Sequence, residues 1–281
     1  MATTKFYCST DDVYRYAGID STVVSTANVE DFIKEAEVEL DNYTQSTYWQ
    51  MATSATASAG DTDTITTTGL TEDEHVGNVI YLKSGTGLGQ YRIIMTNSTT
   101  VITVDRDWTV EPDNTTKYQI FHTGTIAFKN TVEDGDGQYT TFIEDFPLVS
   151  LESLSIDSTS VTPTNVYQYK DVGQITLGTD AEYTNFKAGR QTVETKYFFG
   201  VWNQYTNNVS ALIKKYTAIT AAIMSLASQI GGTYDDVTVF SLGPMSGSLG
   251  EPYTNIREGI LKLKEERVRI ATKLTIYQHL Y

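Results

Sequence analysis

The chain contains 281 residues, of which 40% are hydrophobic, and it has 19 tyrosines, one cysteine and a formal net charge of −15. This charge disfavours nonspecific binding to nucleic acids and to anionic membranes, because both repel so acidic a protein. The single Cys8 excludes an internal disulfide framework. The first residues lack the basic start and apolar run of a signal peptide, and no apolar run approaches the roughly 20 residues that span a bilayer. We therefore expect a soluble protein made in a cytoplasm.

Residues 1–51 are expected to form two helices. In the segment STDDVYRYAGI, Ser9 or Thr10 is a suitable N-cap, acidic residues follow in the first turn, and Gly18 is a suitable stop. A second helix is predicted over residues 29–43. Its apolar residues recur at helical spacing on one side, while most of its acidic residues lie on the other.

Residues 52–124 are predicted to be an inserted β-module. The composition becomes small and Thr-rich after residue 51, and short β-branched segments then alternate with turns. Gly85, Gly87 and Gly89 match neither the dinucleotide-binding spacing nor the P-loop spacing, and a β-branched segment follows them, so a hairpin turn is expected there rather than a phosphate site. Strands are expected at residues 63–70, 78–82, 90–95, 100–105 and 117–122. Strands of this length and spacing predict a small barrel or sandwich.

A second β-rich region is predicted over residues 125–206. Its apolar segments alternate or run continuously between turn residues such as those of EDGDGQ and Pro147. Strands are expected near residues 139–143, 149–156, 166–169, 174–177 and 190–200.

Helical spacing returns over residues 207–281. One helix is expected to begin at Asn207 or Asn208 and to stop at Gly231, and a loop or a strand follows over residues 231–253. The last helix is predicted from about Asn255 to the end of the chain. Its apolar residues follow a heptad seam that Arg267 interrupts. The seam comprises Ile256, Ile260, Leu263, Ile270, Leu274, Tyr277 and Tyr281. Residues 251–281 contain six basic and four acidic residues, which makes this segment basic in an otherwise acidic chain.

The order of these regions predicts an α+β fold. Neither the N-terminal helices nor the C-terminal helices have enough partners alone, so we expect them to pack together as a helical core. The central β-rich region, with its inserted barrel or sandwich, is then an excursion from that core. The seam of the last helix either packs against the other helices of the same chain or contacts another subunit, and the sequence leaves both alternatives open.

No catalytic or metal-binding pattern emerges from the sequence. His75, His122 and His279 lie far apart and lack partners at the spacing of zinc ligands. Asp134 and Asp136 resemble part of a calcium loop, but a predicted strand follows them, so an acidic turn is the better interpretation. No G-x-S-x-G motif occurs. We expect no enzymatic activity, no catalytic residue, no metal and no cofactor.

Two segments carry a resemblance to a known family. STDDVYRYAGID…NVEDFIKEAEVELDNYTQ resembles the N-terminal helices of the head–tail connector (adaptor, or head-completion) proteins of tailed viruses. The β region is similar to theirs in the order of its DG turn, its apolar strands and its final V-x-V-x-Y-x-x-G-like strand. The matching residues there are Asp136, Gly137, Phe146, Pro147, Leu148, Leu151, Leu154, Ile156, Asp157, Ile175, Leu177, Val193, Tyr197 and Gly200.

The resemblance implies a structural virion protein of the neck region, in a bacteriophage or an archaeal virus. Such proteins form a ring, typically twelvefold, beneath the portal and extend the DNA channel toward a stopper or tail-completion protein. DNA would pass through without sequence-specific binding, and no membrane is involved. The resemblance also implies that the last helix contacts a neighbouring subunit or the portal. Channel or portal contacts are implied for the loop residues Tyr234, Phe240, Leu242, Met245 and Leu249.

The competing hypothesis is a carbohydrate- or receptor-binding virion protein that uses the β-module. Trp108 in DRDWTVEP could stack on a sugar, or it could close one end of the barrel. In the connector alternative, the insert would face the capsid, the tail or solvent.

Overall fold

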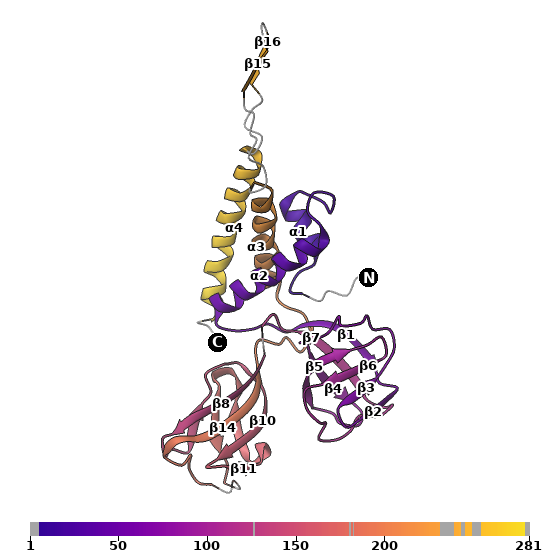
Figure 1. The fold of residues 1–281 in the computed structure, drawn as a ribbon. Coiled ribbons are helices and arrows are strands. Elements are labelled where there is room, and N and C mark those ends of the chain that lie inside the picture. Colours follow the sequence, from indigo (N-terminus) through magenta and orange to yellow (C-terminus); the bar gives the residue numbers. More distant parts are fainter. Residues whose placement is uncertain are drawn as a thin grey trace. The chain divides into compact units, whose positions relative to one another are not determined.

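The structure is a computed structural model that describes residues 6–125, 127–179, 181, 183–230, 239–242, 245–248 and 254–278 (Figure 1). Its mixed α+β class confirms the predicted fold class. The chain divides into a helical unit, formed by residues 6–44 and 210–281, and a β unit, formed mainly by residues 45–209.

The helical unit contains helices from both ends of the chain. Ser9 caps the first helix, because its hydroxyl accepts a hydrogen bond from the N–H of Asp12 (3.2 Å) and the Asp12 carboxylate accepts one from the N–H of Ser9 (3.0 Å). Gly18 ends that helix in the left-handed conformation that glycine adopts without strain. The helices are α1 (Thr10–Ala17), α2 (Thr26–Thr44), α3 (Ala211–Ile230) and α4 (Thr254–Gln278).

The helices of the two chain ends share one apolar core. Val13 of α1 and Ile33 of α2 are buried together with the alanines of α3, and Leu263 of α4 packs against them. Ala218 and Ala222 keep one face of α3 small, which allows neighbouring helices to approach closely. In Figure 1, α3 and α4 run side by side. The expected packing of the N-terminal helices on the C-terminal helices is therefore present.

The predicted start of α3 at Asn207 or Asn208 is wrong. The helix begins after Ser210, whose hydroxyl accepts a hydrogen bond from the N–H of Ile213 (3.3 Å). The side chain of Asn208 instead accepts a hydrogen bond from the amide of Gln50 (2.8 Å). A tertiary contact therefore uses the residue that local propensity assigns to the cap.

The first part of the β unit is an antiparallel sheet with the strand order β1-β7-β4-β5-β6-β3-β2. The glycine segment joins two antiparallel neighbours, β4 and β5, which confirms the predicted hairpin. No pairing joins β1 to β2 in the described sheet, so a closed barrel is not shown. The strands are β1 (Gln50–Thr56), β2 (Ala59–Asp61), β3 (Thr64–Thr66), β4 (Val79–Ser84), β5 (Tyr91–Asn97), β6 (Val101–Val104) and β7 (Lys117–His122).

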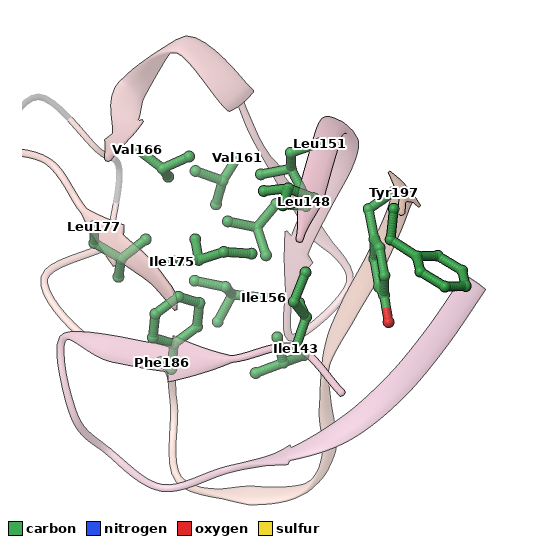
Figure 2. Packing of buried hydrophobic residues seen from close by; sticks show 13 residues of the cluster. Ile143, Leu148, Leu151, Ile156, Val161, Val166, Ile175, Leu177, Phe186 and Tyr197 are labelled. Carbon is green, nitrogen blue, oxygen red and sulfur yellow. The ribbon is translucent and has the colours of Figure 1, made fainter. Parts of the chain in front are cut away.

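The second part of the β unit consists of two antiparallel sheets, with the orders β11-β10-β14-β8 and β12-β13-β9. Side chains from both sheets form one buried cluster, in which Ile156, Ile175 and Phe186 lie close together (Figure 2). The strands are β8 (Phe128–Gly135), β9 (Thr140–Phe142), β10 (Leu148–Ile156), β11 (Thr159–Val161), β12 (Val166–Tyr169), β13 (Gln174–Leu177) and β14 (Gly189–Phe199), with 3-10 turns at Pro163–Asn165 and Lys170–Val172.

A short antiparallel hairpin lies between α3 and α4 in the sequence. It consists of β15 (Val239–Leu242) and β16 (Met245–Ser248), and Leu242 pairs with Met245. The sequence leaves a loop or a strand open over this segment, and these two strands show the strand alternative for residues 239–242 and 245–248.

Candidate functional site

The predicted seam of α4 lies largely against the other helices of the same chain. Ile270 and Leu274 are buried, with 3% and 6% of their surfaces exposed, and Leu263 packs on the core of the helical unit. Ile256 and Ile260 are half-buried. Of the two alternatives that the sequence leaves open, the middle of the seam therefore shows packing against helices of the same chain. The side chain of Tyr277 and the whole of Tyr281 lie outside the described residues.

Arg267, which interrupts the seam, joins α4 to α2. Its guanidinium donates a hydrogen bond to Glu39 (3.0 Å), and the hydroxyl of Tyr216 on α3 donates to the same carboxylate oxygen (3.3 Å). Burial, followed by the negative charge of Glu39, raises the pKa of Tyr216 to about 12. The interruption of the seam is thus a polar connection between three helices.

Buried acidic groups tie the N-terminal residues to the helices. The Glu37 carboxylate accepts a hydrogen bond from the N–H of Tyr7 (2.6 Å), and the Tyr7 hydroxyl donates to Asp41 (3.1 Å). Asp12 forms an ion pair with Lys214 of α3 (2.9 Å). These carboxylates therefore hold the N-terminal residues and α1 to the rest of the helical unit.

Three of the five predicted channel or portal residues lie in the β15–β16 hairpin. Phe240 and Leu242 belong to β15, and Met245 belongs to β16. Tyr234 and Leu249 lie outside the described residues. The channel and portal contacts of these residues remain a prediction.

The residues considered for metal binding have structural roles where they are described. The N–H of buried His75 donates to Asn97 (2.8 Å), and Asp134 accepts from the N–H of Gln191 (2.8 Å). Asp136 accepts from the N–H two residues later, which is typical of an Asx turn. Among the described residues, no group of three or more His, Cys, Asp or Glu side chains is placed to hold a metal ion.

Trp108 is not available as a sugar-stacking residue. It is 5% exposed in the core of the seven-stranded sheet, and the guanidinium of Arg92 lies over its ring at 5.1 Å. Its burial agrees with the other alternative, in which this tryptophan closes the core of the β-module. Among the described residues, none accepts a hydrogen bond from its ring N–H.

An aromatic cluster connects the seven-stranded sheet to the rest of the β unit. Trp49 is fully buried and contacts the rings of Tyr91 and Phe121 in the seven-stranded sheet and the ring of Phe198 in β14, at 5.5–6.3 Å between ring centroids. Arg106 lies 4.7 Å from the ring of Phe128 in β8 and 5.6 Å from that of Phe198. The insert is therefore packed onto the second β region and is not a tethered appendage.

Charged groups reinforce this junction. Arg106 donates a hydrogen bond to Glu152 of β10 (3.2 Å), and a nitrogen of buried Arg92 lies 3.6 Å from the same carboxylate oxygen. Burial and then the neighbouring charge of Arg106 lower the pKa of the Arg92 guanidinium from its ordinary value. The single carboxylate of Glu152 thus balances two cations at the base of the insert.

Sequence reasoning missed an exposed aromatic face on the three-stranded sheet. Phe142, Tyr167 and Tyr169 are 60%, 60% and 54% exposed. Gln174 of the central strand β13 pairs with both Phe142 and Tyr169, so the side chains of Phe142, Gln174 and Tyr169 form one row on the same face. Thr176 pairs with Tyr167 in the next row. The alternation of tyrosines in VYQYK predicts a half-exposed strand, but nothing local places Phe142 beside it.

Comparisons with known proteins give no family for this chain. No protein-family model matches it, and no curated protein matches it either. No described helix combines the length and the apolar composition that a bilayer crossing requires.

Proposed function

We propose that the protein is a structural virion subunit that forms a ring adaptor beneath the portal of a tailed virus, joins the DNA-filled head to the tail and extends the DNA channel. In this proposal no reaction is catalysed and no cofactor is required. The net charge of −15 would help DNA to pass without sticking wherever acidic residues line the channel.

The observation that carries the proposal is the position of the residues on which the family resemblance rests. Eight of the apolar ones belong to a single buried cluster of the second β region. These are Leu148, Leu151, Leu154, Ile156, Ile175, Leu177, Val193 and Tyr197 (Figure 2). Asp157, which stands where the family pattern has its D-G turn, has a positive φ of 51° at the end of β10. A pattern of apolar residues that forms one core in the fold supports a shared architecture more strongly than the same letters scattered over the surface would.

The arrangement of the two chain ends adds support. Helices from residues 6–44 and 210–281 form one unit, so the β regions are an excursion between them. Within that excursion, residues 52–124 form the inserted module of the proposal. Its edge strands β1 and β2 follow one another in the chain. Because the chain passes almost directly from one edge strand to the other, the two edges of the sheet must lie near each other. This favours a sheet that curls toward a small barrel.

Particle imaging of the purified protein, alone and mixed with the portal protein of the same virus, tests this function. We expect a closed ring, or a monomer that becomes a ring on the portal. A monomer that remains a monomer in both samples, at concentrations well above those of virion assembly, would refute the proposal.

The exposed aromatic face favours a second candidate function, the binding of a carbohydrate receptor. Flat aromatic rings stack on sugars, and the amide of Gln174 and the hydroxyl of Thr176 lie in the same rows as potential hydrogen-bond partners. In this alternative the binding surface is the β12-β13-β9 sheet rather than Trp108. Titration of the protein with host surface polysaccharides separates the two functions, because the ring proposal requires no glycan binding.

A further inference from the structure

Helix α4 carries a stripe of exposed residues. Arg257, Leu261, Lys264 and Val268 recur at intervals of four, three and four residues, and all four are exposed. Leu261 is 60% exposed and Val268 is 62% exposed. The buried face of α4, represented by Ile270, lies about a third of a turn away. Single exposed aliphatic residues are ordinary, but two in one stripe flanked by cations form an amphipathic surface.

Helix α2 carries a matching stripe of the opposite charge. Asp31, Glu35, Val38 and Asn42 recur at the same intervals of four, three and four residues, and all four are exposed. Val38 is 45% exposed, and the stripe lies on the side of α2 opposite buried residues such as Ile33. Each stripe extends about 16 Å along its helix at the rise of an α-helix.

We infer that the α2 stripe of one copy binds the α4 stripe of the next copy. In an antiparallel alignment, Val38 meets Leu261 and Glu35 meets Lys264, so that apolar contacts adjoin a pair of opposite charges. The two stripes are different surfaces of one chain, and such heterologous pairing closes into a ring when the rotation permits. This inference rests on the proposed function and specifies the contact by which the ring closes.

Charge is the reason to assign this occupant rather than another protein. Copies of a chain with a net charge of −15 repel one another, and cations at their contact reduce that repulsion. Residues 251–281 are the segment in which basic residues exceed acidic ones, and two of those cations, Arg257 and Lys264, lie in the stripe with Leu261 and Val268. The α2 stripe of the same chain matches the α4 stripe in spacing and length, and in the antiparallel alignment it brings the carboxylate of Glu35 to the cation of Lys264.

A charge swap tests the pairing. One variant carries Asp31→Lys and Glu35→Lys, and a second carries Arg257→Glu and Lys264→Glu. Each variant alone places like charges where residue 35 of one copy meets residue 264 of the next, and we expect its self-association to weaken about tenfold or more. An equimolar mixture of the two restores opposite charges at every contact, so we expect association near that of the unchanged protein, in assemblies that alternate the two variants. Sedimentation velocity measures the association, and circular dichroism checks the fold.

The control variant carries Lys262→Glu and Lys273→Glu. It changes the net charge as much as the second variant does, but on the other exposed side of α4. We expect it to associate like the unchanged protein. The inference is overturned if the mixture associates no better than its components, or if the control weakens association as strongly as the stripe variants. It is also overturned if the unchanged protein does not self-associate, with or without the portal.

The outcome for the proposed function is read separately, from assembly on the portal. If the stripe variants form rings there as well as the unchanged protein does, the function stands and the stripe pairing is wrong. If the charge swap behaves as expected but no sample binds the portal, the pairing stands and the portal function is wrong.

Discussion

Substitution of Trp49 tests whether the insert and the second β region form one cooperative structure. The Trp49 side chain is fully buried, and its ring contacts Tyr91 and Phe121 of the insert as well as Phe198 of β14. The indole N–H donates a hydrogen bond to the carbonyl of Phe199 (3.0 Å). Trp49→Ala removes a large ring from a closed cluster, which typically costs about 3–5 kcal/mol. It also leaves a buried carbonyl without this donor, which costs about 1–3 kcal/mol more.

Together these losses are a large fraction of the ~5–15 kcal/mol that stabilise a folded domain. We expect Trp49→Ala to unfold the β unit or to lower its urea midpoint sharply in far-UV circular dichroism. Trp49→Phe keeps most of the ring contacts and loses the hydrogen bond, so it should cost about 1–3 kcal/mol. Tyr205→Ala is the control, because Tyr205 is 99% exposed, and it should leave the midpoint unchanged. A loss below about 1 kcal/mol for Trp49→Ala, no larger than an ordinary substitution, would refute this account of the junction.

Three further predictions concern other parts of the molecule. Gly85→Ala should lower the thermal stability strongly, because φ is +82° there and a Cβ would lie 2.2 Å from the Thr115 carbonyl oxygen. Gly89→Ala is the control, because φ is +92° there but the space around the Cβ is open, so it should cost only the backbone strain of about 1–3 kcal/mol in thermal melts. Burial raises the pKa of Asp12, but hydrogen bonds from Lys214 and Ser9 outweigh it and hold that pKa below 3.8, so the stabilisation is present above about pH 4 and is lost as the pH falls through the folded-state pKa. Asp12→Asn should therefore lower stability at neutral pH and flatten the acid limb of a stability–pH curve; an unchanged limb would contradict this. Replacing Tyr167 and Tyr169 by Ala should change stability by less than about 0.5 kcal/mol, since both are exposed, and should abolish glycan binding if the second candidate function is correct.

Local sequence patterns predicted the strands whose apolar residues alternate within one segment. β10, β12, β13 and β14 lie within a residue or two of their expected bounds, because their inward residues fill one core. The sequence did not reveal β8, whose residues FKNTVEDG look like the approach to a turn. Its pairing with β14 is long-range, and Gly135 is required there because a Cβ would lie 1.9 Å from the carbonyl oxygen of Lys187. β1 was missed for a related reason, since the small residues of QMATSAT have little strand propensity and are held by β7.

The candidate surfaces show the same limit. Helical spacing identified an apolar seam on α4, but it could not decide whether another helix of the chain covers that seam, and the fold assigns Ile270 and Leu274 to the internal core. The exposed stripe through Leu261 and Val268 follows from the fold, because the fold determines which side of α4 faces the other helices. The aromatic face could not be predicted either. Phe142 and Tyr169 come together because both pair with β13, and Phe142 is distant from β13 in the sequence.

The rigidity of the insert constrains how the proposed ring could use it. Arg106 and Arg92 share the carboxylate of Glu152, and the ring of Trp49 fills the space between the two β regions. A module held by both buried aromatic rings and a shared carboxylate cannot reorient without exposing that cluster to water, which the hydrophobic effect opposes. The insert would therefore present the same surface in every copy of a symmetric ring. A fixed, repeated surface suits contact with a symmetric neighbour such as a capsid or a tail, whereas a mobile receptor-binding arm would need a loose junction.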